Sequence, residues 1–282
     1  MSEFPEIRFQ FGQYAAQFVR WLDTNFQAVF NFISTVVLTF LLNVEAILTW
    51  LPWWVLILIV VALGWKFKTV YSGLLFGLML FIIGTFGLWE PMMETLAIIL
   101  TAVVISLLLG IPIGILMAYN HTMSVVMRPV LDAMQTLPSF VYLIPAMILF
   151  GLGKVPAVFA TTIYAIPPII RLTNLGIRRV SKEMVEAGKS FGASPIQLLT
   201  KVQLPQALPT IMAGSNQTTM MALAMVVIAA MIGAAGLGLE VLISITRVDI
   251  ARGAESGISI VFLAIIIDRI TQAIGERFKY PE

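Results

Sequence analysis

The feature that most constrains this chain is the spacing of its charged side chains, which leaves long apolar stretches between them. From Thr69 to Met127 the only charged or histidine residues are Glu90, Glu94 and His121. A helix needs about 20 mostly apolar residues to cross a lipid bilayer. Hydrophobic residues make up 59% of the chain, against roughly 45–50% in soluble globular domains. A water-soluble fold cannot bury that much apolar surface, so the sequence predicts a polytopic membrane protein.

Several stretches have the length and the apolar composition of membrane-spanning helices. The predicted fold class is therefore all-α, with about seven transmembrane helices and an additional helix near the N-terminus. The expected spans are 46–65, 69–88, 94–118, 136–152, 155–172, 210–237 and 256–274.

The additional helix is expected at 24–43, where polar residues recur every three or four positions between Phe, Val, Ile and Leu. Such a polar stripe is typical of an amphipathic helix. Because only two residues separate this segment from the span at 46–65, the pattern favours a helix that lies in the membrane interface. The alternative is a transmembrane helix packed against the others. The polar positions are Thr24, Gln27, Asn31, Ser34, Thr35, Thr39 and Asn43.

The lysines and arginines of the loops indicate the orientation, because cytoplasmic loops are enriched in these residues. The connection 171–201 carries six of them against two glutamates, so we expect it in the cytoplasm. Alternation from there places the loop at 66–68, the loop at 121–132 and the C-terminal tail on the same side. The parts expected outside are the N-terminal arm, 89–94 and 240–255.

Residues suited to catalysis or metal binding are not evident. His121 is the only histidine and has no second ligand at metal-binding spacing, and the chain contains no cysteine. Mutual pairing or snorkelling explains Asp268 and Arg269 near the inner end of a span. The formal net charge of +2 gives no support for nucleic-acid binding. We therefore expect no catalytic residue, metal or cofactor, and the scarcity of intramembrane charges also disfavours an ion-coupled carrier.

Two short helices joined at a glycine are predicted within the connection after residue 171. Ser181 is a suitable N-cap for the first helix, and Gly192 is suited to end it in a left-handed conformation. Ser194-Pro195-Ile196-Gln197 then has the pattern of a capping box with proline at the first helical position. Such paired start and stop signals favour a docking element for a partner over a solvated loop.

The face of the first short helix and the end of the second are also predicted from the sequence. Residues at helical spacing on the first helix form the expected contact face. Two prolines are expected to interrupt the chain before the next span, because proline lacks a backbone N–H. The face comprises Met184, Ala187, Gly188 and Phe191, and the prolines are Pro205 and Pro209.

This connection resembles the EAA motif of permease subunits in ATP-binding cassette (ABC) importers. That motif reads E-A-A, three residues, G, nine residues, I, one residue, and L-P. The spacing is kept throughout, with Gly188 in place of the second alanine and Val202 in place of isoleucine. We call 180–209 the coupling segment, because the resemblance implies that it docks on a cytoplasmic ATPase. The residues that match the motif or its spacing are Glu186, Ala187, Gly188, Gly192, Leu204 and Pro205.

Three further stretches resemble the glycine betaine/proline betaine permeases of the ProW/OpuAB type: Thr136–Pro145, Leu149–Pro156 and Val227–Gly238. The resemblance to the type I importer transmembrane domain covers about 92–271. Outside it, the apolar and charge patterns predict an N-terminal arm with the amphipathic helix at 1–45, peripheral transmembrane helices at 46–91 and a cytoplasmic tail at 272–282.

The same resemblance implies an assembly in the cell membrane. A permease homodimer would form the path, and two cytoplasmic ATPase subunits would bind ATP and Mg²⁺. An extracytoplasmic binding protein would deliver a quaternary-ammonium osmoprotectant. Neither a nucleic acid nor a cofactor bound by the permease itself is implied.

Candidates for the translocation path are polar residues inside the expected spans, although interhelical hydrogen bonding explains each of them equally. The tryptophans at 50, 53, 54, 65 and 89 lie near span ends, where an aromatic belt is expected. An aromatic cage for a quaternary ammonium is the alternative for these tryptophans. The path candidates are Ser139, Tyr142, Asn216, Gln217, Thr218 and Thr219.

Two other functions are compatible with the sequence. A type I importer permease for choline, carnitine or methionine would share the architecture. A self-sufficient channel or carrier is a rival of a different class, and flux through the purified protein without an ATPase would favour it.

Overall fold

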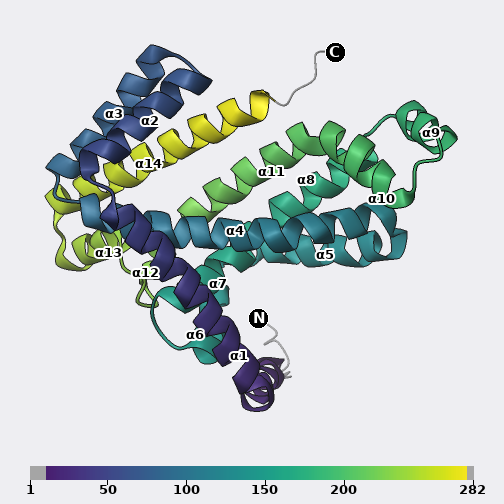
Figure 1. The fold of residues 1–282 in the computed structure, drawn as a ribbon. Helices are drawn as coiled ribbons and strands as arrows, with labels where there is room; N and C mark the ends of the chain where they lie inside the picture. The colour runs from purple at the N-terminus through teal and green to yellow at the C-terminus, as the bar shows by residue number, and fades with distance from the viewer. Residues whose placement is uncertain (1–10, 278–282) are drawn as a thin grey trace, which may run out of the picture.

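The structure is a computed structural model and describes residues 11–277. Within that range the regular elements are helices and no strand occurs, which confirms the all-α prediction (Figure 1). In chain order they are α1 (Phe11–Trp50), α2 (Trp53–Phe67), α3 (Val70–Thr85), α4 (Trp89–Tyr119), α5 (His121–Thr136), the 3-10 helix η1 (Ser139–Tyr142), α6 (Leu143–Phe150), α7 (Lys154–Ala165), α8 (Pro167–Arg178), α9 (Lys182–Ser190), α10 (Pro195–Leu198), the π-helical turn η2 (Leu199–Gln203), α11 (Leu204–Ala224), α12 (Val226–Ala230), α13 (Leu237–Arg247) and α14 (Ile250–Glu276).

Helix α4 lies at the centre and packs closely against α8 through two glycines. A Cβ atom at Gly114 would lie 2.6 Å from the Cβ of Thr173 and 2.8 Å from the carbonyl oxygen of Ile170. One at Gly110 would lie 2.5 Å from Cγ2 of Ile169. Small residues four positions apart allow two helix backbones to approach closely in a membrane. The absent side chains at these two glycines therefore set the spacing between α4 and α8.

Helix α1 differs from the expected N-terminal helix at both ends. It begins at Phe11, before the predicted start at residue 24, and continues past the predicted end at residue 43 as far as Trp50. Phe26 has non-helical backbone angles that mark a kink. Val37 and Leu41 are buried in a cluster with side chains of α4, α6 and α7. The length and apolarity of α1 are those of a membrane span. These observations favour the packed transmembrane helix over the interfacial helix.

The polar residues of α1 are compatible with this packing. Thr35 donates its hydroxyl hydrogen to the carbonyl of Asn31 within the same helix, at 2.8 Å. Glu45 accepts from Nζ of Lys154 at 2.7 Å, and Glu94 lies 3.4 Å from the same ammonium. Glu45, which precedes the expected span at 46–65, is therefore paired with Lys154, a residue far along the chain.

The expected span at 46–65 is wrong, because the chain breaks inside it. Helix α1 ends at Trp50 and α2 begins at Trp53, immediately after Pro52. A proline disfavours a helical conformation at the residue before it, here Leu51. The apolar run thus belongs to two helices rather than one.

The expected span at 136–152 and the expected loop at 121–132 are both wrong. Residues 121–136 form the helix α5, whose N-cap Asn120 accepts a hydrogen bond from the amide of Met123. The chain then turns by 107° between α5 and the helix pair η1–α6, because Leu137 is extended before Pro138. Asp132 of α5 pairs with Arg171 of α8 at 2.6 Å, a long-range contact that the local pattern does not reveal.

Two other expected spans have different limits. The span at 155–172 continues to Arg178 through α7 and α8. The span at 210–237 is wrong at both ends, since α11 runs from Leu204 to Ala224 and is followed by the short helix α12. Gly233 and Gly236 then adopt positive φ angles of 91° and 105°, which only glycine reaches readily. These turns redirect the chain into α13.

The number of long apolar helices is smaller than the seven expected spans. Within residues 11–277 four helices are long and apolar enough to cross a membrane, or five if the bent pair α5–α6 counts as one span. Helices α2 and α3 are apolar but have only 15 and 16 residues, fewer than the roughly 20 needed for a perpendicular crossing. The protein has several candidate spans, in agreement with the predicted polytopic fold.

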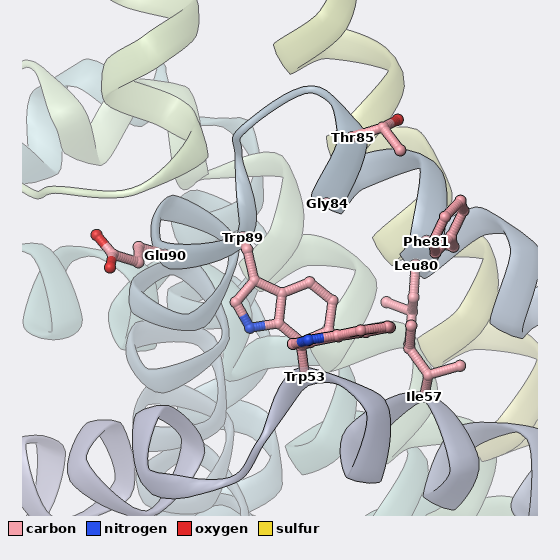
Figure 2. Close-up of a pocket in the computed structure, with 8 residues that line it drawn as sticks. All are labelled: Trp53, Ile57, Leu80, Phe81, Gly84, Thr85, Trp89 and Glu90. Carbon is pink, nitrogen blue, oxygen red and sulfur yellow. The ribbon is translucent and has the colours of Figure 1, made fainter.

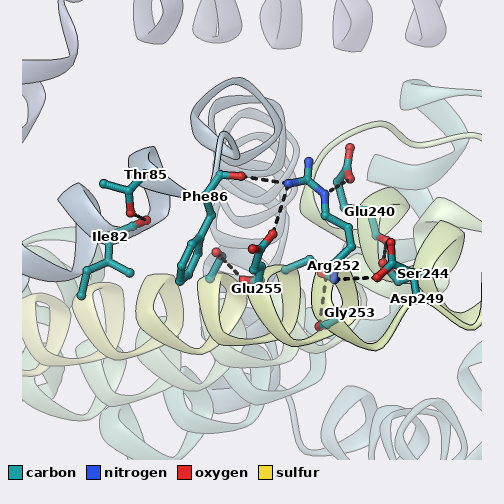
Figure 3. Close-up of polar contacts among 11 residues, drawn as sticks. Ile82, Thr85, Phe86, Glu240, Ser244, Asp249, Arg252, Gly253 and Glu255 are labelled. Atoms are coloured by element: carbon teal, nitrogen blue, oxygen red, sulfur yellow. Dashed lines mark hydrogen bonds and ion pairs between the residues drawn. The ribbon is translucent and has the colours of Figure 1, made fainter.

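Polar contacts join the peripheral helices to the rest at both ends of the bundle. At one end Arg277 donates to the carbonyl of Lys66 at 2.6 Å. At the other end Arg252 donates to Glu240 at 2.8 Å and to the carbonyl of Phe86 at 2.9 Å. Figure 3 shows the Arg252 guanidinium between these two acceptors. The α13–α14 connection is thereby fixed to the α3–α4 connection.

The close contact between α4 and α8 gives a first prediction. Replacing Gly114 by leucine inserts a side chain against the backbone carbonyl of Ile170, which no rotamer change can move. Overpacking of this kind costs about 1–3 kcal/mol or more. We expect Gly114→Leu to lower the thermal unfolding midpoint of the purified protein in lipid nanodiscs. The matched control is Gly257→Leu in α14, where a Cβ atom has no neighbour within 4 Å. An equal midpoint for both variants would contradict the proposed contact.

Candidate functional site

The coupling segment lies at one end of the bundle, where α9 projects beyond the ends of α4 and α8 (Figure 1). The predicted start and stop signals are all confirmed. Ser181 caps α9 by accepting from the amide of Met184 at 3.2 Å. Gly192 has a φ of 76° and ends that helix. Ser194 and Gln197 form a complete capping box at the start of α10. Local side-chain chemistry thus determines the shape of this segment.

The face of α9 that meets the rest of the segment differs from the predicted contact face. Gly188 faces inward, since a Cβ atom there would lie 2.8 Å from Cδ1 of Leu198 and 3.6 Å from Cγ2 of Val202. Leu198 is itself buried. Gly188 therefore allows α9 to pack on α10 and η2, and it does not belong with Met184, Ala187 and Phe191 on one outer face.

The outer surface of the segment is apolar and exposed. The exposed fractions are 92% for Phe191, 74% for Ile196 and 48% for Met184. Glu186 and Ala187 are also exposed on α9. Large apolar side chains exposed together are typical of a protein interaction site. This surface, named the outer face, is defined by Met184, Ala187, Phe191 and Ile196.

The expectation that Pro205 and Pro209 interrupt the chain is wrong. Both lie in the first turns of α11, which follows α10 through the π-helical turn η2 without a break. The amide of Leu204 donates to the carbonyl of Leu199, five residues back. The wider turn offsets the hydrogen bond that a proline cannot make. Leu204 and Pro205 of the EAA pattern thus form the junction of the coupling segment with a helix of the bundle.

Side chains of the bundle hold the base of the coupling segment. Arg178 donates to the carbonyl of Met117 in the last turn of α4 at 2.8 Å. The hydroxyl of Tyr119 donates to the side-chain carbonyl of Gln203 in η2. A cavity of about 430 Å³ lies between these contacts and α9. The sequence pattern gave no sign of these contacts, because their partners lie far apart along the chain.

The six path candidates do not form one site. Tyr142 is buried, its hydroxyl donates to the carbonyl of Met134, and its ring packs edge-on against Tyr164 at 6.5 Å. These contacts brace the bend between α5 and α6. Ser139 is half-buried at the start of η1. Among the described residues no hydrogen bond joins these two to the candidates on α11.

The candidates on α11 have separate roles. Asn216 donates to Oδ1 of Asp268 on α14 at 2.8 Å, and Thr219 donates to the carbonyl of Ser215 at 2.9 Å. Thr218 is fully buried, and its hydroxyl has no hydrogen-bond partner among residues 11–277. Gln217 alone among them is exposed. Among these four residues, Asn216 therefore makes the hydrogen bond to another helix.

The explanation of Asp268 by pairing with Arg269 is incomplete. The Arg269 Nε atom lies 3.9 Å from Asp268, whereas Gln272 donates to Asp268 at 2.6 Å. With Asn216 as a second donor, the carboxylate is held mainly by amides. Asp268 thus links α11 to α14.

Comparison with known proteins establishes the class. The family model for the binding-protein-dependent transport system inner membrane component matches residues 110–280. The chain belongs to this family, and it is a membrane transport subunit rather than an enzyme.

The particular relatives are permeases. The chain is 45% identical over 98% of its length to the glycine betaine/proline betaine transport system permease protein ProW of Escherichia coli, and covers 78% of that protein. It is also 45% identical to the glycine betaine transport system permease protein OpuAB of Bacillus subtilis, over 93% of each chain.

A solved structure shows the same fold. The MetNI methionine ABC transporter in an inward-facing conformation has a chain that matches with a TM-score of 0.61 and 21% identity. The match covers 66% of this chain and 94% of the other one. At that identity the similarity concerns the fold alone, and it confirms the predicted type I importer architecture.

The inward position of Gly188 gives the second prediction. Gly188→Leu inserts a side chain between α9 and the buried Leu198, so we expect α9 to separate from α10 at a cost of about 1–3 kcal/mol. The control is Ala187→Leu on the exposed side of the same helix, where surface substitutions usually change stability by less than about 0.5 kcal/mol. Limited proteolysis of the purified protein measures the difference. Faster cleavage within 181–203 for Gly188→Leu alone is expected, and equal rates would refute the inward position.

Proposed function

We propose that the chain is the permease subunit of an ATP-driven importer for glycine betaine and related quaternary-ammonium osmoprotectants. The observation that carries this proposal is the 45% identity, over nearly the whole chain, to two permeases with glycine betaine in their names. Membership of a binding-protein-dependent family supports delivery of the solute by a binding protein outside the membrane. The ATP and Mg²⁺ would be bound by an ATPase partner.

The outer face of the coupling segment is the proposed contact with that ATPase. Phe191 and Ile196 would enter an apolar groove on the ATPase, while Glu186 would lie at its polar edge. The capped helices and the packing of Gly188 on Leu198 favour a rigid docking element. A rigid element is needed because a flexible loop would absorb the movement of the ATPase instead of transmitting it.

The proposed assembly contains two copies of the chain and two ATPase subunits. The bend between α5 and α6 leaves the apolar side chains of Phe140 and Ile144 exposed at 52% and 58%. A second permease copy would cover such side chains. Between the two copies, Gln217 and Ser139 are the path candidates that are not buried and make no side-chain hydrogen bond within residues 11–277.

The proposed orientation has the coupling segment and the C-terminal end of α14 in the cytoplasm. Contact between Arg277 and Lys66 supports one common side for the tail and the α2–α3 loop. If α1 crosses the membrane, the arm before it also lies in the cytoplasm, contrary to the external arm expected from seven spans. Arg20 would then agree with the enrichment of arginine in cytoplasmic segments.

Substitutions at Gly192 test the coupling role. The φ of 76° lies in the left-handed region, which costs most residues about 1–2 kcal/mol, whereas asparagine tolerates it. We expect Gly192→Val to lose substrate uptake in proteoliposomes that contain the ATPase and the binding protein, and Gly192→Asn to retain most of it. ATP hydrolysis is measured in parallel. Wild-type uptake by Gly192→Val, with normal substrate-stimulated hydrolysis, would remove the coupling role.

The same proteoliposomes test the substrate. Uptake of labelled glycine betaine, choline, carnitine and methionine is compared with the cognate binding protein present. We expect glycine betaine to give the highest uptake, and none without ATP. Preferential uptake of another solute would assign the chain to a different importer. Uptake without the ATPase would instead identify a channel or a carrier.

Single cysteines test the orientation, since the natural chain contains none. An impermeant maleimide added to intact cells should label Glu90→Cys and leave Lys189→Cys unlabelled. Gly12→Cys should also stay unlabelled if α1 crosses the membrane. Permeabilised cells provide the control for reactivity at all three positions. Labelling of Lys189→Cys in intact cells would reverse the orientation.

A further inference from the structure

A pocket of about 430 Å³ opens between α2, α3 and the start of α4. This volume lies in the range of small-molecule sites, roughly 300–1,000 Å³. Figure 1 places these helix ends at the end of α4 opposite the coupling segment. The lining residues precede residue 110, where the match to the family model begins. They are Trp53, Ile57, Leu80, Phe81, Gly84, Thr85, Trp89 and Glu90.

Three aromatic rings from three different helices meet at this pocket. Trp53 begins α2, Phe81 lies on α3 and Trp89 begins α4. The ring centroids of Trp53 and Phe81 are 6.5 Å apart and the rings are tilted by 51°. In Figure 2 the indole of Trp53, seen edge-on, overlaps the lower right part of the Trp89 indole. Trp53 and Phe81 are both about half exposed, so their surfaces are open to a ligand.

The absence of a side chain at Gly84 keeps the cavity open. A Cβ atom built there would lie 3.6 Å from Cε3 of Trp89. A longer side chain would extend toward the Trp89 ring. A tryptophan that only anchors the protein at the membrane interface need not form a cavity with two other rings. Trp53 and Trp89 both line this cavity, whereas Trp54 does not.

The charge at the rim has one sign. Glu90 lines the pocket and is exposed, and it forms no ion pair within residues 11–277. Among the residues that the structure describes, no lysine, arginine or histidine lines the pocket. Figure 2 shows the Glu90 carboxylate directed away from the rings. Its negative charge therefore adds a field that attracts a cation, and the carboxylate does not occupy the aromatic part of the pocket.

We propose that this pocket binds a quaternary ammonium group, separately from the translocation path. The faces of tryptophan and phenylalanine rings attract organic cations, and several rings together form the cages that recognise methylated ammonium groups. The apolar walls of Ile57 and Leu80 suit the methyl groups. A small inorganic cation suits this lining less well, because the walls offer few oxygen ligands. The proposal does not rest on the proposed transport substrate, since a free solute and a choline lipid headgroup share this chemistry.

The test is equilibrium binding of radiolabelled tetramethylammonium to the full chain in nanodiscs made of phosphatidylglycerol and phosphatidylethanolamine. We expect saturable binding to the natural chain. Gly84→Leu, which fills the cavity, and Trp53→Leu, which removes a ring, should each weaken binding at least fivefold. Glu90→Gln should weaken it by a smaller factor and lower its dependence on salt. Trp54→Leu is the matched control on α2 and should bind as the natural chain does. Gel filtration verifies that each variant is folded.

Competition identifies the source of the ligand. Displacement by free glycine betaine supports a solute site, and displacement by phosphatidylcholine in the nanodisc supports a lipid site. Displacement by neither contradicts the proposal, as does equal binding by Gly84→Leu, Trp53→Leu and Trp54→Leu. Uptake by the complete transporter is measured separately, so failure of this site and failure of the proposed transport function are distinguishable.

Discussion

The close approach of α4, α8 and α11 is the contact on which the rest of the structure depends. Lipid tails are as apolar as leucine, so helices in a membrane associate through van der Waals packing and hydrogen bonds. Gly110 and Gly114 bring α4 onto α8. Gly176 and Gly214 do the same between α8 and α11, where added Cβ atoms would lie 3.0–3.3 Å from neighbouring atoms. The coupling segment joins the ends of α8 and α11. A displacement of this segment therefore reaches two helices that cannot move independently.

Charged residues stabilise the connections around that core. Lys154 connects α7 to Glu45 of α1 and Glu94 of α4, and Arg252 connects α14 to α13 and to the α3–α4 connection. A charge near the membrane is costly unless it is paired. These pairs explain why a predominantly apolar chain contains charges near the helix ends. They also fix α1 and the α2–α3 hairpin to the transmembrane domain, although the matching chain of the methionine transporter covers only 66% of this sequence.

Local signals in the sequence predicted the coupling segment better than the spans. Ser181, Gly192 and the Ser194 capping box act within four residues of their partners, so their roles are readable from spacing alone. Apolar composition does not indicate the break at Pro52 or the bend at Pro138, because both arise from the backbone restriction on the residue before a proline. The pairs of Asp132 with Arg171 and of Asn216 with Asp268 depend on tertiary packing. No single-sequence pattern contains that information.

The π-helical turn η2 changes how force would pass from an ATPase to the membrane. Pro205 and Pro209 were expected to interrupt the chain, yet α10, η2 and α11 follow one another with no loop between them. Because the wide turn accommodates Pro205, helical hydrogen bonding continues from α10, which carries Ile196 of the outer face, into the bundle, whereas α9 is joined to α10 by the turn at Gly192. Tyr119 then ties Gln203 at the base of this continuous helix to the end of α4, and Arg178 ties the end of α8 to the same turn. In the proposed importer, movement of the ATPase would therefore pass through the continuous helix from α10 to α11 rather than through a flexible loop. This helix would pivot at the contact of Gln203 with Tyr119.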